Sequence, residues 1–419
     1  MVKPWAVLVY IVADHDAPGT PFKGSANREL RALLRAAGTA KMDVAVQIDY
    51  NRQARPVRIA INPTKGSIKV RRRFRRIDPS KFEVTRQFLG RRRLVKVRVS
   101  RGDEVDAASP DVLCQFLRWG RKQLKAERYA IFFFGHAAGP AGLFFDNLPG
   151  SSLPHAMSLS ELARAVESAE VVVFRDCWMS TLEIAYQLHG VAKFAIATQA
   201  QATLRGRWPY ADLFAILQAT ADGNEAAVAR ALTMRIGSHY DVKGNRFRFA
   251  TVPFTMLDLR QVRRLTTPLR DLARALEASR SSPAAFPSVR LALEQARSGH
   301  VESSVRPGDN ALLDVHALCN NLVAASKKGQ LRKAAQAVKS ALPSVSAFHH
   351  SQSSHFSGVS IYYQPLTERA EERSCVAPLD RLMYKALALS KATGWHRIAL
   401  DPLRAVQPGN ARARVKTRK

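Results

Sequence analysis

Two reactive side chains follow two apolar runs in the middle of the sequence. His136 comes directly after residues 131–135, and Cys177 comes directly after residues 171–176. A cysteine acts as a nucleophile only as its thiolate, and a nearby histidine favours that form and can later protonate a leaving group. If the two side chains meet, they predict nucleophilic catalysis. The alternative for Cys177 is an inert cysteine buried in a strand.

The elements around these two residues predict that they do meet. Short continuous apolar runs are typical of strands buried on both faces of a parallel sheet. Between the two runs, residues 158–162 open an amphipathic helix, so that the unit is strand, helix, strand. In such a unit the strands are parallel and their carboxyl ends lie on one edge of the sheet. We therefore expect His136 and Cys177 to project from the same edge.

Apolar periodicity predicts strands and helices along most of the remaining chain. The expected strands are residues 5–13, 42–48, 194–198 and 359–363. The expected helices are residues 26–37, 110–125, 180–188, 210–240 and 381–392, and residues 255–345 read as almost wholly helical. The sequence therefore predicts an α/β fold with a mostly parallel sheet flanked by helices and a largely helical C-terminal part.

The composition is unusual mainly in its charge. The 419 residues carry a formal net charge of +31, which predicts attraction to polyanions. The four cysteines have irregular spacing and no CxxC pair, which argues against a disulfide framework and favours a reducing compartment. Residues 5–13 are a poor signal peptide, and no apolar run is long enough to span a bilayer. We expect a cytoplasmic protein.

Much of the positive charge lies in one block. Residues 51–101 contain 18 Lys or Arg and two acidic residues, and short alternating segments predict a β-hairpin insertion with a basic outer face. Such a surface could bind nucleic acid through phosphate contacts or dock an acidic protein, and a merely solvated face is the alternative. Residues 403–419 form a second basic segment, a tail with six Lys or Arg and no acidic residue.

Two groups of side chains could hold a metal ion. Asp14, Asp16 and Asp49 follow predicted strands at the active edge, where clustered carboxylates suit a hard cation, although aspartates are also common in turns. A second group lies in a predicted loop and consists of His349, His350 and His355. No acid or cysteine accompanies these histidines at ligand spacing, so we expect a solvated loop and no metal there.

Several segments together resemble the clostripain family of cysteine peptidases, which is related to caspases, gingipains and separases. The similarity covers roughly residues 5–365. The segments that carry it, in the family's order, are residues 5–10 with Asp14 and Asp16, Tyr129 before His136, residues 176–179 with Glu183, residues 206–210, Asp314 and residues 358–362.

The resemblance implies a caspase-like fold and hydrolysis of peptide bonds in a protein or peptide substrate. It implies a catalytic dyad of His136 and Cys177, and it makes a calcium requirement possible, although no calcium-binding loop is recognisable. We expect a catalytic domain over residues 1–215 that includes the insertion at 51–101. A mainly helical region would follow over residues 216–402, with a strand returning near 358–363, and the basic tail would end the chain.

Two departures from the family pattern affect the expected substrate-binding residues. The family usually has glycine after the catalytic histidine, where backbone N–H groups help to form the oxyanion hole, but this chain has Ala137. Relatives that cut after Arg or Lys carry aspartate two residues before the cysteine, where this chain has Arg175. Asp176 cannot replace that carboxylate, because neighbouring strand residues point to opposite faces. Trp178 is expected to pack near the cleft.

The departure at Arg175 suggests a changed specificity. A guanidinium in the specificity pocket would repel a basic side chain, so we expect a preference for acidic or uncharged residues before the scissile bond. Alternatively, Arg175 pairs with a carboxylate of the protein itself. The competing function is a catalytically inactive caspase-like protein that uses its basic face to bind nucleic acid or an acidic partner.

Overall fold

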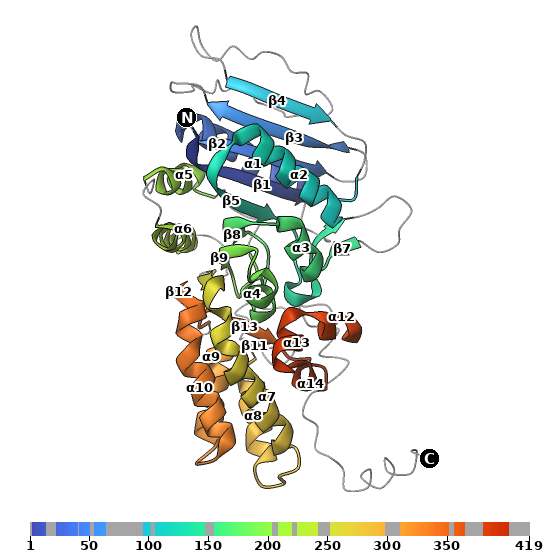
Figure 1. The fold of residues 1–419 in the computed structure, drawn as a ribbon, viewed down its shortest axis with the longest axis vertical. Coiled ribbons are helices and arrows are strands. Elements are labelled where there is room, and N and C mark those ends of the chain that lie inside the picture. The colour runs from blue at the N-terminus through green and yellow to red at the C-terminus, as the bar shows by residue number, and fades with distance from the viewer. Residues whose placement is uncertain are drawn as a thin grey trace, which may run out of the picture.

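The computed structural model describes residues 2–13, 22–40, 42–50, 54–63, 95–101, 105–146, 155–202, 208–219, 224–241, 252–297, 311–351, 356–364 and 380–401. Its centre is a nine-stranded sheet with the strand order β12-β10-β9-β8-β5-β1-β2-β3-β4 (Figure 1). The strands are β1 (Lys3–Ala13), β2 (Asp43–Tyr50), β3 (Ala54–Pro63), β4 (Val95–Arg101), β5 (Ala126–Phe134), β8 (Ala169–Phe174), β9 (Ala192–Ala197), β10 (Phe254–Asp258) and β12 (Ser346–His350).

The five central strands of this sheet are parallel. β1 pairs in parallel with β2 and β5, and β8 pairs in parallel with β5 and β9. The outer strands β3, β4, β10 and β12 join in antiparallel pairs at the two edges. The predicted mostly parallel sheet is therefore confirmed for the part of the sheet that carries His136 and Cys177.

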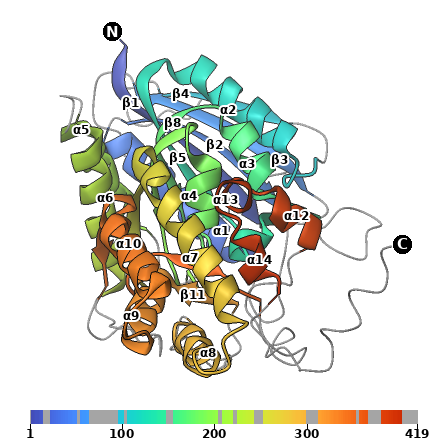
Figure 2. The same ribbon diagram turned by 60° about the horizontal axis from the view of Figure 1, so that its bottom comes forward.

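Helices cover both faces of the sheet because its central strands are apolar on both sides. In β1, Leu8 and Tyr10 belong to one core cluster, whereas Val7 and Val9 belong to the other. The second cluster packs under α1 (Phe22–Ala40), α5 (Tyr210–Ala219) and α6 (Glu225–Tyr240). The first packs under α2 (Pro110–Leu124), α3 (Leu159–Val166) and α4 (Leu182–Leu188). Figure 2 shows these layers from the end that carries the later helices.

The later helices gather at the end of the molecule opposite to β4 (Figure 1). They are η3 (Leu259–Leu265), α7 (Thr266–Ser279), α8 (Phe286–Gln295), α9 (Val315–Ala325), α10 (Gln330–Val345), α12 (Arg381–Ala386), α13 (Ala388–Thr393) and α14 (His396–Ala399). Short antiparallel pairs are formed by β11 (Leu312–Asp314) with β13 (Ser360–Tyr362), and by β6 (Leu143–Asp146) with β7 (His155–Met157). A 3-10 turn, η2 (Gly139–Ala141), lies between β5 and β6.

Two parts of the sequence prediction are wrong at the end of the sheet. Residues 254–258 form β10, although we expected residues 255–345 to be almost wholly helical. His349 and His350 lie in β12, although we expected a loop. A short apolar run does not by itself distinguish strand from helix, and here pairing with β9 decides. β10 and β12 come after residue 215 and still join the main sheet, so the sheet does not mark the expected division there. The division at residue 215 stays a prediction.

The basic block of the sequence is described only in part. β3 and β4 pair with each other and form the edge of the main sheet, while residues 64–94 lie outside the described residues, as does the tail at 403–419. The expected basic outer face of this block therefore stays a prediction. In the part of the chain that the structure describes, no helix combines the length and apolar character that a membrane crossing requires.

Candidate active site

The two reactive residues follow neighbouring parallel strands at the same level. β5 and β8 run in register through the pair of Phe133 and Phe174. His136 is the third residue after the first of these partners, and Cys177 is the third after the second. Two chains that leave paired positions in the same direction carry their third residues to the same edge. The structure therefore confirms the predicted strand–helix–strand unit and places His136 and Cys177 at the same edge of the sheet.

The turn that carries Cys177 is held by backbone hydrogen bonds on both sides. The N–H of Arg175 donates to the carbonyl of Phe133 at 2.9 Å, which prolongs the β5–β8 pairing. The N–H groups of Trp178 and Ser180 donate to the carbonyls of Ala200 and Thr198 at 3.0 and 2.9 Å. Cys177 itself is 9% exposed. Cys177 thus lies on a turn that is fixed by backbone hydrogen bonds.

The segment after His136 is a tight hairpin. The N–H of Phe144 donates to the carbonyl of His136 at 2.8 Å, and the N–H of Ala138 donates to that of Gly142 at 2.9 Å. Ala137 forms an antiparallel bridge with Leu143 between these two bonds. It therefore occupies a non-hydrogen-bonded position, whose N–H takes no part in the ladder. The backbone N–H of Ala137, which stands where the family has glycine, therefore takes no part in the hairpin and could donate in an oxyanion hole.

The hairpin and the cysteine turn touch at Gly139. Trp178 has a φ of 55°, which is uncommon for a residue other than glycine. Gly139 has a φ of +57°, and a Cβ built on it would lie 3.0 Å from the carbonyl oxygen of Trp178. The two loops that carry His136 and Cys177 are therefore in contact at a glycine where even a Cβ would crowd the carbonyl of Trp178.

This contact gives a first prediction. Gly139→Ala should lower the free energy of unfolding by about 2 kcal/mol, because alanine both strains a left-handed backbone and presses on Trp178. Gly394→Ala is the matched control, since Gly394 has a φ of +73° and nothing within 4 Å of its Cβ position. Urea unfolding of both variants would measure the difference. An equal loss in the two variants would show that the contact with Trp178 costs nothing.

Asp176 lies on the opposite face of the turn from Arg175, as the alternation of strand residues predicts. Its side chain is fully buried beside Gly135 and Phe144. Burial raises the pKa of the Asp176 carboxyl well above its ordinary value, and the backbone of Gly135 and the nearby Arg175 offset this effect only in part. The carboxyl is thus held toward its neutral form, and it lies against Gly135, the residue that precedes His136.

Arg175 is buried beneath the active edge, where it pairs with an acidic residue of α1. Its side chain is 2% exposed and that of Glu29 is 1% exposed, and the two form an ion pair of 2.6 Å. Burial by itself lowers the pKa of Arg175, but the carboxylate of Glu29 outweighs this effect and raises it. Of the two roles considered from the sequence, the structure places Arg175 in an ion pair with a carboxylate of the protein itself.

Aromatic side chains enclose this ion pair. The guanidinium lies 4.6 Å from the ring centroid of Phe134 and 5.4 Å from that of Trp208. The N–H of Trp208 donates to Glu29 at 3.3 Å, and its indole donates to the hydroxyl of Tyr240 at 2.8 Å. Burial, followed by Glu29, raises the pKa of Tyr210 well above its ordinary value. Arg175, two residues before Cys177, is thus surrounded by aromatic side chains, and its ion pair with Glu29 has no net charge.

Sequence reasoning missed Glu29, although a signal for it was present. Glu29 comes three residues after Ala26 and four before Leu33, both of which are buried in α1. An acidic residue at this spacing lies on the apolar face of the helix, and a carboxylate there needs a buried cation. What the sequence does not show is which of the 65 Lys and Arg residues supplies it.

Of the three aspartates that could hold a cation, one lies within the described residues. Asp49 is buried at the end of β2, while Asp14 and Asp16 lie outside the described residues. His349 bonds Thr255 and the carbonyl of Phe356, so it serves the fold. Within the described ranges no group of three His, Cys, Asp or Glu could hold a metal ion. The candidate cation site therefore lies mostly outside the described residues, and the calcium requirement stays a prediction.

In a comparison with protein families, the model of the clostripain family matches residues 83–372 of the sequence. The chain belongs to the clostripain family. Because this family consists of cysteine peptidases, the chain is a cysteine-type peptidase. The matched range includes both His136 and Cys177. No curated protein matches the chain.

Solved structures of clostripain-type proteases share the fold. A secreted C11 cysteine protease from Bacteroides thetaiotaomicron, in complex with an irreversible peptide inhibitor, matches with a TM-score of 0.62 and 14% identity, over 94% of this chain and 99% of that one. An inactive zymogen C11 protease from Parabacteroides distasonis matches with the same TM-score, identity and coverage. These matches confirm the predicted caspase-like α/β fold.

Proposed function

We propose that this clostripain-family member is a cysteine endopeptidase with a catalytic dyad of Cys177 and His136. The observation that carries the proposal is the common register of β5 and β8, which puts both residues at one level of one sheet edge. The hairpin contact between Gly139 and Trp178 supports it, because it fixes the two loops against each other. Neither the family nor the structural matches favour the alternative of an inactive binding protein.

In the proposed reaction, the Cys177 thiolate attacks the carbonyl carbon of the scissile peptide bond. His136 takes up the thiol proton and then gives it to the leaving amine, so that a thioester remains on Cys177. Water hydrolyses the thioester and restores the thiol. Backbone N–H groups of Cys177 and Ala137 would stabilise the oxyanion, a role for which Ala137 is suited because its N–H lies outside the hairpin ladder.

The proposed specificity excludes basic residues before the scissile bond. In relatives that cut after Arg or Lys, a carboxylate stands where this chain has Arg175. Here that position is filled by a closed ion pair of Arg175 with Glu29, which offers no net negative charge to a basic side chain. Because Glu29 already engages the guanidinium, an acidic substrate gains no free cation either. We therefore narrow the expected preference to uncharged side chains.

A panel of internally quenched peptides that differ only in the residue before the scissile bond would test this specificity. We expect cleavage after Arg or Lys to be at least about tenfold slower than cleavage after an uncharged residue. The reason is that no free carboxylate would compensate the positive charge of the substrate side chain in the pocket. The control is the same panel with Cys177→Ala, which reveals any contaminating protease. Fastest cleavage after Arg would overturn the proposed specificity.

Three further expectations from the sequence are kept as proposals. The substrate is a protein or peptide, the location is cytoplasmic, and a calcium requirement is open to the same peptide assay with and without calcium. Binding of nucleic acid or an acidic partner at residues 51–101 stays a proposal too, since most of that block lies outside the described residues.

A further inference from the structure

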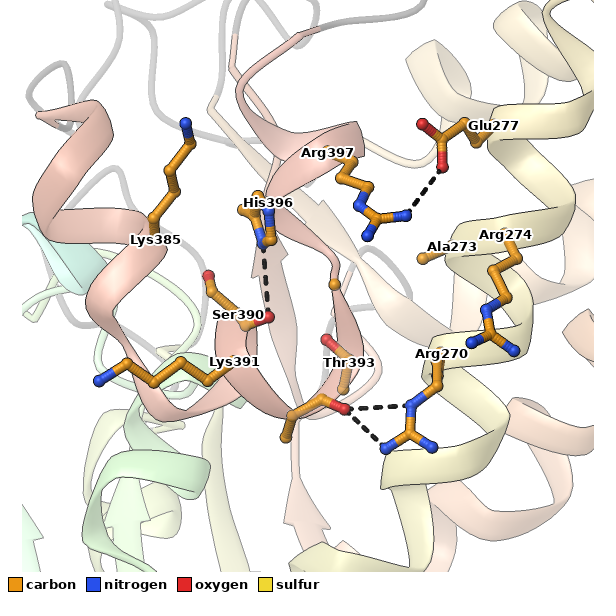
Figure 3. Close-up of a pocket in the computed structure, with 12 residues that line it drawn as sticks. Arg270, Ala273, Arg274, Glu277, Lys385, Ser390, Lys391, Thr393, His396 and Arg397 are labelled. Atoms are coloured by element: carbon orange, nitrogen blue, oxygen red, sulfur yellow. Dashed lines mark hydrogen bonds and ion pairs between the residues drawn. The ribbon is translucent and has the colours of Figure 1, made fainter.

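A basic hollow of about 340 Å³ lies between α7 and the segment from α12 to α14 (Figure 3). It is not part of the dyad edge, since none of its lining residues belongs to β5, β8 or the loops that follow them. Five cationic side chains line it, against the single carboxylate of Glu277. The five are Arg270, Arg274, Lys385, Lys391 and Arg397.

Two of these cations hold the walls of the hollow in place. Arg270 donates to the carbonyl of Ala392 at 2.9 and 3.2 Å, which ties α7 to the end of α13. Arg397 pairs with Glu277 at 3.5 Å across the same junction. Within the described residues, Arg274, Lys385 and Lys391 have no ion-pair partner. The hollow is therefore preformed, and within the described residues four of its five cations have no carboxylate partner, since Arg270 bonds only a neutral carbonyl.

A buried hydroxyl in the wall lacks a hydrogen-bond partner. Ser390 is 1% exposed, and its Oγ has no partner among the described residues. A helical serine commonly bonds a carbonyl of the preceding turn, as Thr393 does with Leu389 at 2.7 Å. Figure 3 shows Ser390 between Lys385, Lys391 and His396. A buried hydroxyl without a hydrogen-bond partner is unfavourable unless another molecule bonds it. Ser390 lines the cationic hollow.

We propose that this hollow binds a chain of linked phosphates. Lysine, arginine and hydroxyl groups are donors that suit phosphate oxygens, and the lining contains one carboxylate, that of Glu277, which is already paired. A peptide would bring N–H groups that need acceptors, so the donor-rich lining disfavours it. Arg270 and Arg274 lie on α7, whereas Lys385, Lys391 and Arg397 lie on the segment that faces it (Figure 3), so an extended anion can contact more of them than a single phosphate.

Isothermal titration of the full chain with sodium tripolyphosphate tests the proposal. The double variant Arg274→Gln/Lys391→Gln should weaken binding by about 100-fold, because two charge-assisted contacts are lost. Ser390→Ala should weaken it by about tenfold without any change in charge. Thermal unfolding would show that both variants fold, as expected for two exposed side chains and one hydroxyl that bonds nothing.

The matched control separates a site from the general attraction of a chain with net charge +31. Lys327→Gln/Lys328→Gln removes two exposed charges outside the hollow and should leave the affinity unchanged. An equal loss in this control would overturn the proposal, as would unchanged affinity in Ser390→Ala and the charge variant. Orthophosphate that binds as tightly as tripolyphosphate would overturn the preference for linked phosphates. Titration with adenosine triphosphate distinguishes the two sources of linked phosphates. An affinity equal to that of tripolyphosphate fits a nucleotide, and a weaker affinity fits an inorganic chain.

Discussion

Replacing Cys177 with alanine should abolish peptide hydrolysis, with a loss of turnover on the order of 10⁶-fold, as for removal of the nucleophile from a serine peptidase. The reason is that the thioester intermediate cannot form without the sulfur, and water attack on an oriented peptide is very slow. His136→Ala should cause a comparable loss, because effects within one catalytic unit are not additive. Turnover of the preferred quenched peptide measures both.

The chain provides its own controls for this prediction. Cys319 is buried in α9, where burial raises the pKa of its thiol to about 12, and Cys114 is a half-buried thiol on α2 that donates to Glu167 at 3.5 Å. Alanine at either position should leave turnover within about threefold of the wild type, because neither thiol lies at the active edge. Full activity in Cys177→Ala would refute the dyad and require another nucleophile.

The strand–helix–strand unit could be predicted because local chemistry decides it. The apolar runs before His136 and Cys177 are too short for core helices, and the helix between them has a strong start signal. In the structure Ser158 and Glu161 form a capping box at that start. The start of α2 was predictable in the same way, with Ser109 as its N-cap and Pro110 in its first turn. Such signals lie within a few residues of the element that they begin.

The edges of the sheet and the partner of Arg175 could not be predicted, because distant segments decide them. β10 pairs with β9 and β12, and the latter lies about ninety residues further along the chain. Glu29 and Arg175 meet on one face of the sheet, although nearly 150 residues separate them along the chain. The sequence showed that Arg175 departs from the family pattern, but only the fold shows that its charge is already compensated.

The Glu29–Arg175 pair should therefore dominate the stability of the region under the active edge. Glu29→Gln leaves a guanidinium buried without its carboxylate, and we expect it to lower the free energy of unfolding by about 3–5 kcal/mol. In Glu29→Gln/Arg175→Met no charge is left uncompensated, and most of that stability should return, because an apolar side chain of similar length fits between Phe134 and Trp208. Urea unfolding followed by tryptophan fluorescence measures both variants.

The control for this prediction is a pair of the same kind at the surface. Arg235 and Asp212 also form an ion pair of 2.6 Å, but their side chains are 34% and 53% exposed. Asp212→Asn should cost less than about 1 kcal/mol, since water replaces the lost carboxylate. If Glu29→Gln cost no more than this, the buried guanidinium would have to find water or another acceptor. Arg175 would then offer an available positive charge at the position two residues before Cys177, and the proposed specificity would fail together with the stability prediction.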